Sequence, residues 1–426
     1  MDIVVYSLKA ISYTITNPAF LVILFVLGLV LYSKNKKSRM IEKMILGSER
    51  HSALELTLSQ IVLGILGGIG ASIISTSLGI TFKDGSAIIL MFLISVILMM
   101  LKPRFICFSY SGAILGILSL MNILISEFFL VNKIDILDIN IVSLIALIGV
   151  LHIIEGFIVA LDGQKGALPV FTKRENETIG GFALNRYYTI PMVLMVFMVK
   201  EQYYFGKEIA IGNWWPILKG TLSNIQLESL MLSMIPVVAI IGYNSVTFTK
   251  SKRGKSFFSG SLIFVFGFVL VGISQLIIDS YFLQLIAVII MPVLHELMIK
   301  FERYKEKNDK PRYFNEKEGI RVLEVGKNTL ADKIGVKSGD ILLSVNGDII
   351  EDEISFPKLL KECGSKIVLK LKRNDEKILE VVYEKISKSE RFGIIFVPKK
   401  EYQSVSKTKF KDIIKNVIED KNENSR

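Results

Sequence analysis

The stretch that decides the fold of the C-terminal part is Gly319–Asp348, GIRVLEVGKNTLADKIGVKSGDILLSVNGD. Its apolar and β-branched residues predict one strand over Ile320–Val325 and another over Ile341–Val345. Between them, Thr329–Ile334 is predicted to form a short helix. Asn346-Gly347 then predicts a two-residue hairpin turn. Together these elements indicate a small α+β domain.

The flanking residues extend this domain. Asn328 is expected to cap the short helix, and Gly335 to end it in the left-handed conformation. Further along, Glu353–Cys363 predicts a second helix. Ile367–Leu371 and Ile378–Tyr383 predict a pair of strands.

The spacing of small and apolar residues here resembles a bacterial PDZ domain, whose pattern includes GV-x-x-GD-I-L and V-N-G. The matching residues are Ala331, Gly335, Val336, Gly339, Asp340, Ile341, Leu342, Val345, Asn346 and Gly347. The resemblance implies that an extended peptide adds as a strand beside the second helix, with backbone N–H groups receiving its terminal carboxylate. An unrelated small α+β module is the alternative.

The carboxylate-binding loop of such domains is an apolar–glycine–apolar run that leads into a strand. The residues before Gly319 lack this pattern, whereas RFGIIF, Arg391–Phe396, fits it after the last predicted strand pair. The resemblance therefore implies a circularly permuted domain, with an ordinary closing strand as the alternative. The candidate groove residues are Phe392, Gly393, Ile394 and Ile395 on the strand, and Phe356, Leu359 and Leu360 on the helix.

The remainder of the chain has the composition of a membrane protein. The 426 residues are 51% hydrophobic, and the mean hydropathy is +0.49. The formal net charge of +11 suits basic cytoplasmic loops that attract anionic lipid, and we expect no nucleic-acid binding. Two cysteines, Cys107 and Cys363, imply no disulfide framework.

Apolar runs predict about nine membrane-spanning helices within residues 1–300. The runs are 19–32, 55–80, 86–101, 105–130, 140–161, 187–199, 227–246, 258–278 and 281–299. Two of them, 86–101 and 187–199, are shorter than the roughly 17–20 residues that a span needs, and Pro191 lies in the second. Residues 3–16 are mildly amphipathic and are expected near the interface.

Basic residues divide unevenly between the two sides of this nine-span bundle. The basic loop 33–52 shares its side with Lys102, Arg104, Lys165, Lys173, Arg174, Arg186, Lys250, Lys252, Arg253 and Lys255. The opposite side holds Lys83, Lys133, Lys200, Lys207 and Lys219. The positive-inside rule places the richer side, and with it the C-terminal domain, in the cytoplasm.

The chain is therefore expected to be a polytopic α-helical membrane bundle followed by a small α+β PDZ-like domain. Residues 1–300 would form the bundle, 301–312 a charged linker and 313–400 the domain. The polar tail 401–426 has apolar residues at helical spacing, which predicts a short amphipathic helix. This helix would dock on its own domain, on a partner or on anionic lipid.

Small residues gather in one of the predicted spans. They are Gly64, Gly67, Gly68, Gly70 and Ala71. Small side chains allow two helices to approach closely, so this stripe predicts a helix-packing face. A permissive composition without a specific partner is the alternative.

The histidines argue against hydrolytic chemistry. An intramembrane metalloprotease needs HExxH, and His295-Glu296 begins that pattern, but Ile299 replaces the second histidine. The chain has three histidines, and none lies in the C-terminal domain to form a Ser/His/Asp triad. We expect no enzymatic activity, no metal site and no cofactor.

Two polar pairs remain within predicted spans: His152 with Glu155, at i and i+3, and His295 with Glu296. Ionisable groups in lipid are costly unless they are paired. We therefore predict a polar clasp between two helices, with an ion or metal site as the alternative.

Local runs across most of the chain resemble the MinJ family, membrane topology factors for cell division in rod-shaped Gram-positive bacteria. The runs are Asn17-Pro18, Leu151–Gly156, Gly180–Tyr188, Pro292–Leu297 and Phe392–Val397. The resemblance implies a scaffold at division sites or poles that connects a coiled-coil protein of the DivIVA type to the MinCD division inhibitor. An adaptor of a membrane protease and a transporter-like bundle with an accessory domain are the alternatives, and homo-oligomerisation is left open.

Overall fold

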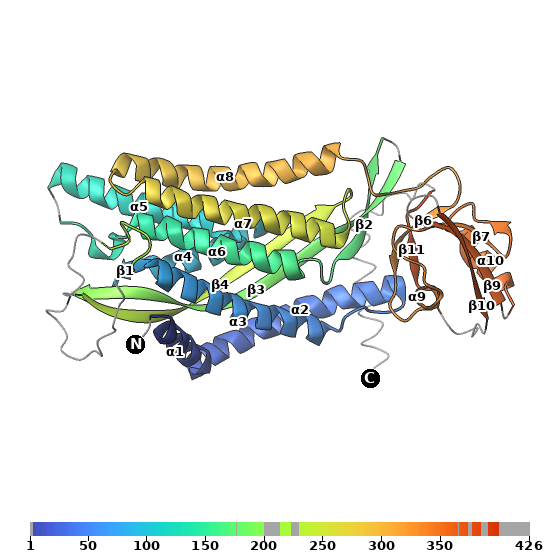
Figure 1. Ribbon diagram of the computed structural model, residues 1–426, viewed down its shortest axis with the longest axis horizontal. Helices are drawn as coiled ribbons and strands as arrows, with labels where there is room; N and C mark the ends of the chain where they lie inside the picture. Colours follow the sequence, from blue (N-terminus) through green and yellow to red (C-terminus); the bar gives the residue numbers. More distant parts are fainter. Residues whose placement is uncertain are drawn as a thin grey trace. The chain divides into compact units, whose positions relative to one another are not determined.

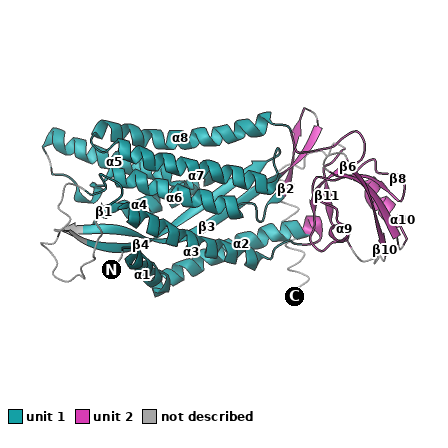
Figure 2. Cartoon of the chain, viewed as in Figure 1, with its two compact units in different colours: residues 1–43, 49–168, 182–310 teal, residues 44–48, 169–181, 311–426 magenta. Residues whose placement is uncertain are grey.

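The computed structural model describes residues 3–130, 132–175, 177–199, 214–222, 230–364, 366–373, 377–384 and 391–399. The chain divides into two compact units (Figure 2). The membrane unit comprises Met1–Lys43, Glu49–Leu168 and Phe182–Lys310. The C-terminal unit comprises Met44–Ser48, Pro169–Gly181 and Pro311–Arg426. The predicted tail helix, 401–426, lies outside the described residues.

The described part of the membrane unit contains six helices that are long and apolar enough to cross a membrane. They are α2 (Pro18–Leu46), α3 (Ala53–Leu78), α5 (Phe108–Phe129), α6 (Ile141–Asp162), α7 (Lys252–Leu276) and α8 (Tyr281–Asn308). Two shorter apolar helices are α1 (Ile3–Thr16) and α4 (Ile88–Leu101). The chain is a multi-pass membrane protein, as its composition predicts.

Two predicted spans, 187–199 and the described part of 227–246, are strands, so their prediction as helices is wrong. They lie in β3 (Glu177–Val199) and β4 (Leu230–Thr247), which pair antiparallel from Phe182 opposite Thr247 to Val199 opposite Leu230. Figure 1 shows them as one long hairpin. Hydropathy reports burial and does not distinguish a buried strand from a buried helix. Pro191, which would break a helix, is tolerated at a strand edge.

The edge of β3 opposite β4 lies against the glycine-rich face of α3, just before it pairs with β1. A Cβ built on Gly64 would lie 2.0 Å from the carbonyl oxygen of Thr189, and one on Gly68 would lie 1.8 Å from that of Pro191. No other residue type permits this approach. The predicted small-residue stripe is therefore a close-packing face, but part of it receives a strand rather than a helix.

Side chains at the two ends of this contact satisfy the backbone of β3. Gln60 Nε2 donates to the carbonyl oxygen of Tyr187 at 2.9 Å, and Ser72 Oγ accepts from the Val193 N–H at 2.9 Å. Each four-residue step along a helix rises about 6 Å, close to the roughly 6.6 Å of two strand residues. The two repeats therefore stay in register along the contact.

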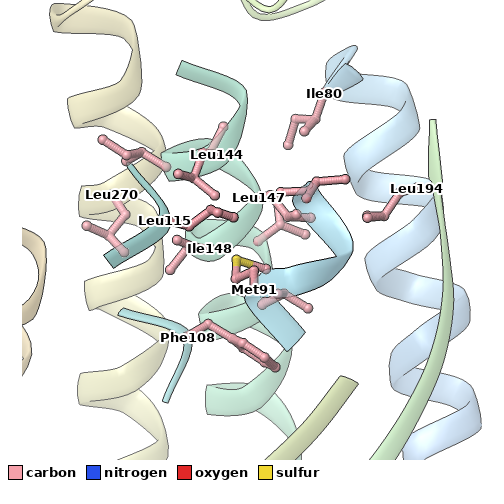
Figure 3. Packing of buried hydrophobic residues seen from close by; sticks show 14 of the residues in the cluster. Ile80, Met91, Phe108, Leu115, Leu144, Leu147, Ile148, Leu194 and Leu270 are labelled. Atoms are coloured by element: carbon pink, nitrogen blue, oxygen red, sulfur yellow. The ribbon is translucent and has the colours of Figure 1, made fainter. Parts of the chain in front are cut away.

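The hydrophobic core of the membrane unit is centred on α6. Leu144, Leu147 and Ile148 of this helix are fully buried, and Figure 3 shows them among side chains from α4, α5, α7 and β3. The α6–α7 contact is also glycine-mediated, because a Cβ on Gly156 would lie 2.5 Å from the carbonyl oxygen of Gly260. Small residues thus allow close backbone contact here as well.

A buried ion pair ties β3 to the end of α6. Asp162 and the Arg186 guanidinium are each 1% exposed and are hydrogen bonded. Arg186 also donates to Ser59 Oγ at 2.8 Å, and the Tyr188 hydroxyl donates to Asp162 at 3.0 Å. Buried charges need such partners because water is excluded from them.

The C-terminal unit contains a sheet in the order β10-β9-β7-β6-β11, with β8 paired to β7. The strands are β6 (Ile320–Val325), β7 (Ile341–Val345), β8 (Asp348–Ile349), β9 (Lys366–Arg373), β10 (Lys377–Glu384) and β11 (Ile394–Phe396). The helices are α9 (Leu330–Ile334) and α10 (Ser355–Glu362). The other strands are β2 (Leu168–Arg174), β5 (Tyr313–Phe314) and β1 (Thr81–Lys83). Of these, β1 pairs parallel with β3.

Local turn chemistry explains why these elements match the sequence prediction closely. Gly335 ends α9 with φ +85°, and its N–H reaches the carbonyl oxygens of Ala331 and Asp332. Asn346 and Gly347 both have positive φ in the β7–β8 hairpin. One detail is corrected: Thr329, not Asn328, is the N-cap of α9, since Asn328 adopts φ +60°.

Candidate functional site

A polar cluster inside the membrane unit brings together three ligand-bearing side chains. Cys107 lies at the N-cap of α5, His152 in the middle of α6 and His295 on α8. One ligand atom from each lies within 4.8 Å of the other two. His152 and His295 are 1% and 8% exposed, and their ring centroids are 5.9 Å apart. His152 and His295, one residue from each predicted polar pair, thus meet at one place.

The hydrogen bonds of His152 define its tautomer. Its Nδ1 lies 2.7 Å from the carbonyl oxygen of Ile148, which can only accept, so Nδ1 carries the proton. Its Nε2 lies 3.1 Å from Cys107 Sγ and 3.4 Å from Ser109 Oγ. The lone pair of Nε2 therefore faces the cluster.

The hydrogen bonds of His295 form a chain with a carboxylate at its end. The Tyr110 hydroxyl donates to Glu296 Oε1 at 2.6 Å, and His295 Nδ1 lies 3.3 Å from the same hydroxyl. Because Tyr110 has one proton to donate, its oxygen accepts from His295 Nδ1–H. Arg104 lies 3.8 Å from Glu296. The Nε2 lone pair of His295 is left available.

Glu155 is placed differently from the other predicted clasp residues. It lies one turn beyond His152 on α6 and is half-buried. The hydrogen bonds of His152 go to Ile148, Cys107 and Ser109 rather than to Glu155.

The sequence reasoning missed Cys107, Ser109 and Tyr110. One sequence signal does point to Cys107. It follows Pro103–Ile106, which separates two apolar runs, and so it stands at the N-cap position of α5. Its position against α6 and α8 depends on helix packing.

A second candidate site is the outer edge of β11, the last strand of the C-terminal sheet. The Gly393 carbonyl accepts from the Gly326 N–H, and the Val397 N–H donates to the Arg321 carbonyl, both at 2.8 Å. Backbone groups alternate in direction along a strand. The N–H and C=O groups of Ile394 and Phe396 consequently point away from β6, toward the outer edge.

Aromatic side chains connect this strand to α10. The ring of Phe356, which is 3% exposed, lies 5.0 Å from that of Phe392 and 4.9 Å from that of Phe396. Phe392, Ile394 and Phe396 remain half-buried, as do Leu359 and Leu360 on α10. Ile395 is 8% exposed and lies on the opposite face of β11. Half-exposed apolar side chains thus border the outward-facing backbone.

The turn before β11 requires glycine. Gly393 has φ +73°, and a Cβ there would lie 2.2 Å from Cγ2 of Thr329. The carbonyl oxygens of Arg391 and Phe392 accept from the Leu330 and Ala331 N–H groups at 3.4 and 3.1 Å. The loop is thereby fixed on the first turn of α9.

No family model matches the chain, and no curated protein matches its sequence.

Proposed function

We propose that the protein is a non-enzymatic membrane scaffold whose C-terminal unit is a circularly permuted PDZ-like domain that binds an extended peptide of a partner protein. The observation that carries the proposal is the outward-facing backbone of Ile394 and Phe396 at the end of the sheet. A strand edge that presents backbone N–H and C=O groups outward, with apolar side chains beside them, suits strand addition. Gly393 lies where the carboxylate-binding loop of such domains is expected.

The proposal places this domain in the cytoplasm. The β3–β4 hairpin returns the chain to the side on which it began, as two spans would. Replacing two predicted spans by the hairpin therefore leaves the sidedness of all other loops unchanged. The basic residues Lys165, Lys250 and Lys252 stay on the same side as the end of α8, and the positive-inside rule favours the cytoplasm for that side.

The cellular role that we propose is division-site selection, in which the scaffold bridges a DivIVA-type protein and MinCD. Its support is the sequence resemblance to the MinJ family. A deletion strain should lose the septal or polar localisation of these two partners. Unchanged localisation of both would contradict the role without touching the peptide-binding proposal.

The biochemical test uses the full-length protein in nanodiscs and an array of C-terminal peptides from the host proteome. Two variants isolate the backbone contribution: Phe396→Ala removes the ring, and Phe396→Pro removes the ring and the outward N–H. Losing one hydrogen bond should weaken binding by about threefold to tenfold in the proline variant relative to the alanine variant. Equal binding by both variants, or no binding peptide for the native chain, would contradict strand addition at β11.

A further inference from the structure

We propose that Cys107, His152 and His295 form an intramembrane binding site for a transition-metal ion, with Zn²⁺ the ion that fits best. Cysteine and histidine are the ligands that zinc prefers, and three such residues leave its fourth tetrahedral position to water or another ligand. The three come from α5, α6 and α8, so a bound ion would link three helices of the membrane unit.

The protonation pattern of the cluster matches what a metal requires. Both histidines carry their proton on Nδ1, held by the Ile148 carbonyl and by the Tyr110 hydroxyl. Both therefore present the Nε2 lone pair, and the groups behind them act as the outer shell that orients metal-bound imidazoles. The hydrogen-bonded series His295–Tyr110–Glu296 ends in a carboxylate, and this carboxylate raises the basicity of the His295 imidazole.

The distances fit a metal after small side-chain rotations. Bond lengths of about 2.3 Å to sulfur and 2.0 Å to nitrogen put a tetrahedral S–N pair about 3.5 Å apart. Cys107 Sγ and His152 Nε2 are 3.1 Å apart, and the widest spacing in the cluster is at most 4.8 Å. Movements of about 1 Å would bring all three atoms to these separations.

Binding at this site also partly neutralises the ion within the low-dielectric interior. Binding exchanges the thiol proton of Cys107 for the metal, and the proton leaves to solvent. One divalent cation then faces one thiolate, which halves the charge that the ion brings into the site. The carboxylate of Glu296 is matched separately by Arg104.

The test measures metal content in full-length protein purified through a tag without histidine. After incubation with zinc and dialysis, the native chain should hold about one Zn²⁺, and Cys107→Ser, His152→Ala and His295→Ala should each lose most of it. The chain supplies matched controls, His51→Ala and Cys363→Ser, which should retain zinc. Zinc content that is equal in all five variants, or absent from the native chain, would overturn the proposal.

Cobalt substitution keeps the test decisive if a ligand variant fails to fold. Thiolate coordination gives Co²⁺ a charge-transfer band in the near ultraviolet, and tetrahedral geometry gives intense visible bands. In Cys363→Ser, Cys107 is the one remaining thiol. The band should persist in this variant, which keeps all three proposed ligands, and its absence there would contradict ligation by Cys107.

Discussion

Ser72 Oγ on α3 accepts a hydrogen bond from the backbone N–H of Val193 on β3, at 2.9 Å. This contact shows how a sheet edge is satisfied inside a membrane unit, where water is absent and unpaired backbone groups are costly. At the other end of the contact, the Gln60 side chain donates a hydrogen bond to the Tyr187 carbonyl. Between them, Gly64 and Gly68 let the helix press directly on the strand.

The first prediction concerns this glycine face. Gly68→Ala should destabilise the membrane unit, because the new methyl group would overlap the Pro191 carbonyl, and the overlap outweighs the better helix propensity of alanine. A cost of about 2 kcal/mol would lower the melting temperature in detergent by roughly 5 °C. Gly272→Ala is the control, since its Cβ meets nothing within 4 Å. Equal melting of the two variants would contradict the contact.

The second prediction concerns the buried ion pair. Asp162→Asn should lower the free energy of unfolding by about 3–5 kcal/mol, because Arg186 would keep its charge without a counterion. Lys165 contacts the same carboxylate from a 39% exposed position. Lys165→Ala should therefore cost less than about 1 kcal/mol. Unfolding by a denaturing detergent, monitored by circular dichroism, measures the free energy of unfolding of both variants. Similar losses in the two variants would show that burial does not determine the contribution of the ion pair.

The third prediction concerns the loop before β11. Gly393→Ala should cost more than about 2 kcal/mol, since it adds left-handed backbone strain to a collision with Thr329. Limited proteolysis of the full chain should then cut the C-terminal unit faster. Gly364→Ala, which meets nothing within 4 Å, should change the cleavage rate little. Native-like protease resistance in Gly393→Ala would mean that this conformation is not required.

The fourth prediction concerns the reactivity of Cys363. Burial raises the pKa of its thiol, and the carboxylates of Asp348 and Glu362 raise that pKa further. The protonated thiol therefore adds stability below the unfolded pKa of about 8.5, and this is lost as pH rises through the folded pKa. Alkylation, read at this peptide by mass spectrometry, should need higher pH in folded than in urea-unfolded protein.

Asp348→Asn tests the cause of that shift. Removing the nearby negative charge should move the alkylation profile of Cys363 toward lower pH. Asp332→Asn, on α9, should leave the profile unchanged. A profile that is insensitive to Asp348→Asn would assign the raised pKa to burial and Glu362 instead.

The sequence predicted the C-terminal unit well because its determinants are local. Gly335 and Asn346-Gly347 adopt the backbone conformations that their residue types favour, and these positions fix the ends of α9 and β7. The strand Ile320–Val325 was predicted with its observed bounds for the same reason.

The membrane unit was harder to predict because several determinants are tertiary. The apolar content of 187–199 is the same whether the segment forms a helix or a strand. The glycine-rich face of α3 that packs against the strand lies more than 100 residues earlier in the sequence. Likewise, Cys107 could not be assigned to the histidine cluster from spacing alone. His152 and His295 were recognised as polar residues in apolar runs, but their meeting depends on how α6 and α8 pack.

The most direct test of the account is amide hydrogen exchange at single-residue resolution in the full-length protein, with and without the tightest peptide from the array. Strand addition predicts that the outward-facing amides of Ile394 and Phe396 become protected. The Val397 amide, already bonded to Arg321, should change little. Peptide binding that leaves Ile394 and Phe396 exchanging at their free rates, with protection elsewhere, would contradict the central claim.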